Sequence, residues 1–251
     1  MYRQLTTCRA LISAMTLGLG TAHAAEVVIE PDNYLGNVSN VAPGATLSAF
    51  RRSAAGSYQF TPALSIPGGS WSPTGNRVFG HSLIGTSDRA ELWDNLNGAY
   101  ECEQSGFCFD DFRAFRVDFD VPTTNVGVLT TFHGWESPDP MELAAFNSDG
   151  ERLLRCWVMG VHNGVLQSGV LPAPRYLDAS GEATGPVCGT VIVKKNCGTF
   201  GPGAHNCDYV VSLKVIRRQS DIAYVMVAGP LFSNTFAAVD KLTYNYIPLG
   251  H

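Results

Sequence analysis

The sequence lacks the features of several large protein classes. After its first 24 residues it has no uncharged apolar run near the ~20 residues of a membrane span. Only 16% of the residues are charged, and the basic ones are scattered, whereas nucleic acids and anionic membranes require broad basic surfaces. Helix signals are scarce too, the best being the short stretch 87–96, SDRAELWDNL. We therefore expect no membrane span, no nucleic-acid partner and little helix.

The sequence contains no complete motif of the metal-enzyme or lipase type. Apart from His23 near the start, the five other histidines are dispersed, at 81, 133, 162, 205 and 251, and none has the spacing of a metal enzyme. Ser82 in VFGHSLIG resembles the serine of a lipase turn, G-x-S-x-G, but Ile84 stands where the second glycine belongs. A β-branched residue crowds such a turn, so we interpret VFGHSLI as a strand. We predict no catalytic residue and expect a binding or structural protein more than an enzyme.

The start of the chain predicts export. Arg3 and Arg9 precede the uncharged apolar run 10–20 and the small-residue site Ala22-His23-Ala24, which is the pattern of a secretory signal peptide. Residues 25–251 would then form one mature domain, periplasmic or extracellular. The leader holds two of the 17 basic residues and none of the 22 acidic ones, so 15 basic residues would face 22 acidic ones, a net charge of −7.

Cysteine usage fits an oxidising compartment. An even number of cysteines after an export signal predicts disulfide bonds, and six follow the leader here: Cys102, Cys108, Cys156, Cys188, Cys197 and Cys207. None of these has the close spacing of a zinc knuckle. Six cysteines allow 15 pairings, among which sequence does not choose. Proximity favours Cys102–Cys108 first and Cys197–Cys207 second, which leaves Cys156–Cys188. We expect the Gly-, Pro- and Cys-rich segment 170–208 to be a disulfide-stapled loop insertion.

Strand patterns are plentiful. In FRAFRVDFDV, Phe115, Val117 and Phe119 alternate with charged residues, which is the period of a half-buried strand. Further strands are expected at 126–132, 142–146, 151–159, 209–216, 222–229 and 236–247, and short edge strands at 30–50. We expect the strands between 112 and 159 to be consecutive antiparallel partners joined by tight turns. The regular spacing predicts an all-β antiparallel sandwich or barrel.

Several segments together resemble a broad group of exported bacterial β-sandwich proteins: EPDNYLGNVSNVAPGATLSAF, FRVDFDVPTTNVGVLTTF, ELAAFNSDGERL, IAYVMVAG and FAAVDKLTYNY. They look like the jelly-roll domains of exosortase-sorted surface proteins and, more distantly, like carbohydrate-binding modules of galactose-binding-like fold. The resemblance covers most of 104–169 and 209–247 and implies a jelly-roll sandwich. Sorted members end in a Pro-Glu-Pro-type tail, whereas this sequence ends in YNYIPLGH, so we expect free export.

The stretch HGWESPDPME is a candidate sugar site. It lies between two expected strands and combines an aromatic ring with acidic acceptors: Trp135, Glu136, Asp139 and Glu142. The ring would stack on a pyranose face, and the carboxylates would accept hydroxyl hydrogen bonds. The alternative is an ordinary solvated hairpin loop.

Three carboxylates form a candidate metal site. The first and last strands of a jelly roll often neighbour one another, so Glu30, Asp32 and Asp240 would meet and bind calcium, which prefers oxygen ligands. Its role would be structural. The alternative is that each carboxylate is solvated or caps a turn.

The sequence thus predicts an exported, non-catalytic jelly-roll sandwich, with glycan or extracellular matrix as its expected partner and calcium as its one expected cofactor. An exported polysaccharide hydrolase and a purely structural extracellular protein are the alternatives. Two facing carboxylates in a cleft would favour the hydrolase, a shallow aromatic platform the binder, and neither the structural protein.

Overall fold

The computed structural model describes residues 24–53, 58–68, 72–81, 111–134, 141–160, 166–171, 187–199, 205–228 and 237–246. They form one 3-10 turn, η1 (Pro31–Asn33), and fifteen strands: β1 (Ala25–Ile29), β2 (Gly36–Asn37), β3 (Ala45–Ser53), β4 (Tyr58–Pro62), β5 (Leu64–Pro67), β6 (Arg77–Gly80), β7 (Asp111–Thr123), β8 (Asn125–Gly134), β9 (Met141–Phe146), β10 (Arg152–Gly160), β11 (Leu166–Leu171), β12 (Val187–Thr199), β13 (His205–Ile216), β14 (Ile222–Ala228) and β15 (Ala237–Tyr246). Over these ranges there is no α-helix, hence none that would cross a membrane. The all-β prediction is confirmed.

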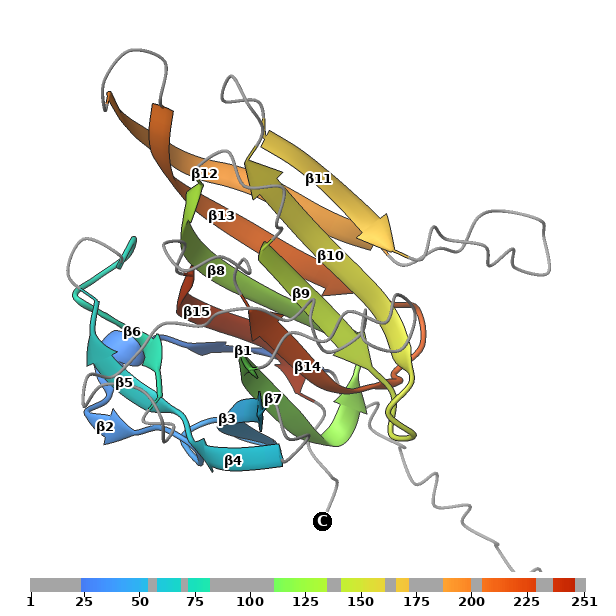
Figure 1. The fold of residues 1–251 in the computed structure, drawn as a ribbon. Helices are drawn as coiled ribbons and strands as arrows, with labels where there is room; N and C mark the ends of the chain where they lie inside the picture. Colours follow the sequence, from blue (N-terminus) through green and yellow to red (C-terminus); the bar gives the residue numbers. More distant parts are fainter. Residues whose placement is uncertain are drawn as a thin grey trace, which may run out of the picture.

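The strands form two antiparallel sheets packed face to face (Figure 1). The eight-stranded sheet has the order β12-β13-β8-β15-β6-β5-β2, with β1 also paired to β15. The seven-stranded sheet has the order β11-β10-β9-β14-β7-β3-β4. The predicted sandwich is therefore present. The expected neighbourhood of the first and last strands is also confirmed, since β1 pairs with β15 along its whole length.

Strand β7 shows how the sequence pattern makes a two-faced sheet. Phe115, Val117 and Phe119 are buried, whereas Arg116 and Asp118 between them are only partly covered. Side chains alternate across a strand, so the apolar set points at the opposite sheet and the charged set points away from it. The predicted alternation is confirmed.

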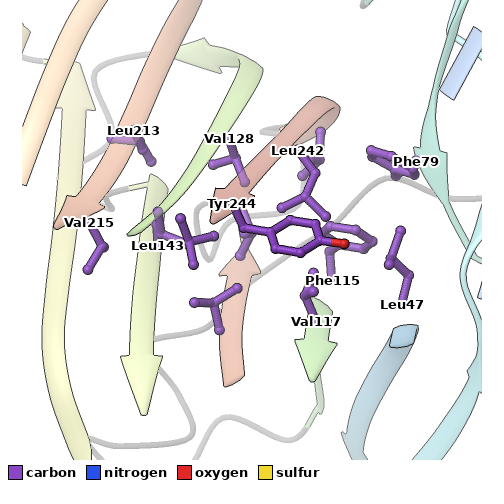
Figure 2. Close-up of a cluster of buried hydrophobic side chains, with 14 of the residues drawn as sticks. Leu47, Phe79, Phe115, Val117, Val128, Leu143, Leu213, Val215, Leu242 and Tyr244 are labelled. Atoms are coloured by element: carbon purple, nitrogen blue, oxygen red, sulfur yellow. The ribbon is translucent and has the colours of Figure 1, made fainter. Parts of the chain in front are cut away.

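The core lies between the sheets and takes side chains from both (Figure 2). It includes Leu47, Phe115, Val117 and Leu143 from the seven-stranded sheet and Phe79, Val128, Leu213, Val215, Leu242 and Tyr244 from the eight-stranded sheet. Phe79 and Phe115 meet in the middle, with ring centroids 4.9 Å apart and ring planes 14° apart. Burying each such ring contributes roughly 1.5–3 kcal/mol.

The expected pairing of β7 with β8 is wrong. Strand β7 pairs with β3 and β14, whereas β8 pairs with β13 and β15 in the other sheet. Only Thr124 separates the two strands, and the Thr123 hydroxyl donates to the carbonyl of Asn245 on β15, at 2.8 Å. The chain therefore crosses between sheets at this point. Of the consecutive strands, β9 and β10 do pair as expected.

Two segments form longer strands than the sequence predicted: the segment 170–208, expected to be a loop, and the segment 30–50, expected to hold only short edge strands. Within 170–208, β12 pairs with β13 from Val187 to Thr199, because the β-branched run Val191-Ile192-Val193 outweighs the Gly and Cys residues around it. Residues 172–186 and 200–204 lie outside the described residues. In the leading segment, β2 is short, but β3 has nine residues and lies between β7 and β4.

Candidate functional site

The outer face of the seven-stranded sheet carries a run of aromatic side chains, here called the aromatic strip: Tyr58, Phe60, Phe50, Tyr224 and Phe146. Each alternates along its strand with residues that face the other way. For example, Ala49 and Val225 belong to the core between the sheets, whereas Phe50 and Tyr224 belong to a separate cluster. The strip crosses β4, β3, β14 and β9, which are adjacent in the sheet apart from the intervening β7.

One end of the strip is open to solvent. Tyr58 is 64% exposed and Phe60 is 55% exposed. Both rest on Phe50, which is buried, with ring centroids 5.7 Å and 5.1 Å away. Phe50 and Phe60 also stand directly opposite each other in the β3–β4 ladder. Two exposed rings thus pack against a third, buried ring at the edge of the sheet.

Arg116 holds the middle of the strip. Its guanidinium carbon lies 5.4 Å from the ring centroid of Phe60 and 3.8 Å from that of Tyr224, within the range of cation–π attraction. Its Nε and Nη2 atoms donate to the Asp118 carboxylate, Nη2 at 2.6 Å. The planar pairing fixes the guanidinium between the two rings and offsets its charge.

The other end of the strip is closed. Tyr224 stacks on the fully buried Phe146, with centroids 4.6 Å apart and planes 8° apart. Burial raises the pKa of the Tyr224 phenol, an effect that the positive charge of Arg116 opposes and the negative charge of Asp118 reinforces. The phenol therefore stays a neutral hydroxyl at physiological pH.

The predicted sugar site falls mostly outside the described residues, which exclude Trp135, Glu136 and Asp139. Glu142 is described, and it lies within β9 rather than in a loop, with only 1% of its surface exposed. Its carboxylate is ion-paired with Nε of Arg155 on β10. Glu142 is thus part of the strand expected at 142–146 and not of a solvated loop, and the arginine supplies the partner that burial requires.

Two of the predicted metal ligands, Glu30 and Asp32, lie near enough to the third, Asp240 on β15, to act on it electrostatically. The β15–β8 register shifts at Asp240, which is fully buried. Its Oδ2 accepts the Thr74 amide at 2.9 Å and the Thr74 hydroxyl at 2.6 Å, whereas its Oδ1 is buried without a hydrogen-bond partner. Burial is the main cause that raises the pKa of Asp240, and the nearby charges of Glu30 and Asp32 add to it.

The other two carboxylates have partners of their own. Asp32 accepts the amide of Asn76 at 2.8 Å and lies so close to Gly75 that a Cβ there would come within 2.0 Å of its Oδ2. Glu30 pairs with Lys241 at 2.6 Å. Within the described ranges, no three His, Cys, Asp or Glu side chains are arranged to hold a metal ion. The calcium site stays a prediction.

The serine of VFGHSLIG also lies outside the description. Val78, Phe79 and Gly80 belong to β6, and His81 after them is buried. The strand interpretation is therefore confirmed as far as His81, whereas Ser82 lies outside the described residues.

Sequence reasoning missed the aromatic strip. Its members lie as far as 174 positions apart, from Phe50 to Tyr224, and only the sheet register brings them together. One local signal was available: in the segment YQF, Tyr58 and Phe60 are two residues apart and therefore share one face of a strand. Two aromatic residues at this spacing indicate a pair of neighbouring rings on one face of a strand.

No family model matches the chain, and no curated protein or solved structure is similar to it. The feature of the described residues that bears on function is the aromatic strip on the outer face of the seven-stranded sheet.

Proposed function

We propose that the protein is an exported, non-catalytic β-sandwich that binds a glycan through the exposed end of the aromatic strip. The observation that carries the proposal is the pair of exposed rings, Tyr58 and Phe60, which pack against Phe50, with the Arg116 guanidinium over the Phe60 ring. Such rings present flat apolar surface to a sugar ring. The partly exposed Asp118 carboxylate and the N–H groups of Arg116 would bond its hydroxyls.

The charge balance of the platform favours an uncharged glycan. The guanidinium of Arg116 is already paired with Asp118 through Nε and Nη2. An acidic sugar would have to compete with that carboxylate, and a basic sugar would have to compete with the guanidinium. A neutral sugar needs only hydrogen bonds from the pair, which leaves the pair intact.

A binder is favoured over a hydrolase on this face. Glycoside hydrolysis needs one carboxylic acid and one carboxylate on either side of the scissile bond. Asp118 and Glu142, two carboxylates of this face, are each ion-paired with an arginine. Both carboxylates are thus already engaged by an arginine, whereas stacking on a ring requires no carboxylate.

The strand order supports a jelly roll as the scaffold. Eight strands pair as a hairpin folded over on itself: β6 with β15, β7 with β14, β8 with β13 and β9 with β10. The two halves of this hairpin alternate between the sheets, as two Greek keys do. Strands β11 and β12 would then be an insertion at the hairpin's end. The predicted resemblance to exported jelly-roll proteins, and with it a periplasmic or extracellular location, belongs to the same proposal.

The proposal is tested by affinity electrophoresis of residues 25–251 in gels containing neutral polysaccharides. Phe60→Ala is expected to weaken binding by about 1–3 kcal/mol, the scale of an aromatic anchor. Leu35→Ala is the matched control, because Leu35 is 83% exposed but lies outside the strip. Equal binding by Phe60→Ala and the wild type would overturn the proposal.

Two further measurements sharpen the result. Raising the ionic strength from about 0.1 M to about 1 M shortens the Debye length from ~10 Å to ~3 Å and should leave binding to a neutral glycan unchanged. Trp135→Ala separates the strip from the loop predicted from sequence. If Trp135→Ala abolishes binding and Phe60→Ala does not, the loop is the site.

A further inference from the structure

We propose that a disulfide bond between Cys156 and Cys188 crosses the core and ties the two sheets together. Cys156 lies on β10 of the seven-stranded sheet and is fully buried among the core side chains. Its sulfur belongs to a disulfide bond, and the register of the opposite sheet identifies the partner.

The sulfur of Cys156 reaches the other sheet. Its Sγ lies 3.7 Å from the carbonyl oxygen of Lys214 on β13. Strand β12 runs beside β13, with Gly189 opposite Lys214 and Cys188 opposite Val215. Position 188 is therefore one strand away from Lys214 and within one residue of its level.

Position 188 also belongs to the correct face. Directly opposite residues of an antiparallel pair share one face of the sheet. Val215, the residue opposite Cys188, is fully buried in the core between the sheets. By its register, position 188 thus lies on the same face of the sheet as the buried Val215. Disulfides that join two packed sheets also occur in antibody domains.

The remaining described cysteines are too far away. Cys197 lies nine residues beyond Cys188 on β12, which is ~30 Å at ~3.3 Å per residue, whereas a disulfide spans ~4.4–6.8 Å between Cα atoms. Cys197 and Cys207 stand directly opposite each other in the ladder. They are therefore placed to bond to one another. Cys102 and Cys108 lie outside the described residues.

Formation of the bond needs an oxidant, for which we name a disulfide-carrying oxidoreductase of the exported compartment. One cysteine thiolate attacks the carrier disulfide and forms a mixed disulfide; the second thiolate then displaces the carrier, which leaves as a dithiol. The two protein thiols lose two electrons and two protons, and the carrier gains them. Because Cys156 is fully buried, this exchange must occur before the sheets close.

Peptide mapping tests the pairing, because trypsin separates the candidates. Cleavage after Lys and Arg puts Cys156 on peptide 156–175, Cys188 on peptide 176–194, and both Cys197 and Cys207 on peptide 196–214. Unreduced protein, alkylated while denatured in acid and then digested, should give 156–175 joined to 176–194. Peptide 196–214 should be lighter by two hydrogen atoms. Peptide 156–175 joined to any other peptide would overturn the proposal.

Variants supply a second test. Cys156→Ser should release one thiol, and alkylation should find it on peptide 176–194; a label on another peptide would contradict the pairing. Cys188→Ser should lower Tm by the same amount as Cys156→Ser, and the double variant should lower it no further, because both remove one bond. Additive losses would refute a shared bond. If the variants do not fold, the wild-type peptide map still decides.

Discussion

The two faces of the seven-stranded sheet use one set of strands for different purposes. On β7, Phe115 and Val117 point into the core, while Arg116, between them in sequence, points outward and lies between two aromatic rings. The inner face stabilises the fold by removing apolar surface from water. The outer face keeps rings in fixed positions and leaves two of them exposed. A shift of one residue along a strand thus separates the core between the sheets from the aromatic strip.

The largest expected effect lies on the inner face. Phe115→Ala removes a fully buried ring stacked on Phe79 and should lower the free energy of unfolding by about 4 kcal/mol. Phe60→Ala on the outer face should lower it by less than about 1 kcal/mol, because that ring is 55% exposed. Urea unfolding followed by circular dichroism measures both. Equal losses would show that the outer face is a second core.

The next largest effect concerns the ion pair between Glu142 and Arg155. Glu142→Ala leaves the mostly covered Arg155 without its carboxylate, with side-chain exposures of 11% for Arg155 and 1% for Glu142. Breaking a buried pair in this way costs about 3 kcal/mol. Replacing both residues by Met should cost much less, since both charges of the pair are then removed. A double variant as unstable as Glu142→Ala would show that the pair is not the cause.

A smaller effect is expected at the centre of the strip. Arg116→Met removes the cation from Phe60 and Tyr224 and should cost about 1 kcal/mol of stability, as a partly exposed cation–π contact does. Glycan affinity should fall as well, because hydroxyl donors are lost. Arg116→Lys, which keeps the charge but not the planar fork, should bind with intermediate affinity. Unchanged affinity in both variants would remove Arg116 from the site.

The smallest effect is a pH dependence at Asp240. Burial raises the pKa of this carboxyl above its ordinary value of 3.8, so the folded protein binds this proton more tightly than the unfolded chain does. This contribution to the free energy of unfolding therefore falls as pH rises from 3.8 through the raised folded pKa, and is constant above it.

Asp240→Asn removes the titration and should make that decline shallower. Its side-chain oxygen can still accept the hydrogen bonds that Thr74 donates in the wild type. Urea unfolding at a series of pH values between about 4 and about 8 measures the difference. A variant with an undiminished decline would assign the pH dependence to other groups.

The local sequence pattern predicted individual strands better than it predicted which strands pair with each other. The alternation of Phe115, Val117 and Phe119 identified β7 and its buried side. The same pattern could not reveal that β8, one residue later, joins the other sheet, because partner choice depends on strands distant in sequence. The aromatic strip was not predicted for the same reason, since its members come from strands that are distant in sequence. The neighbourhood of the first and last strands was predicted correctly, since it is a property of the whole topology.

The pairing of β1 with β15 has a consequence for the time course of folding. Strand β15 lies inside its sheet, between β8 and β6, and β1 also pairs with it. Among the described strands, β15 is nevertheless the last in the sequence. The eight-stranded sheet therefore cannot complete its native ladder while the chain is still being synthesised. Contacts between such distant segments slow folding. The chain should thus emerge with unpaired strand edges and acquire its structure only after its final strand arrives.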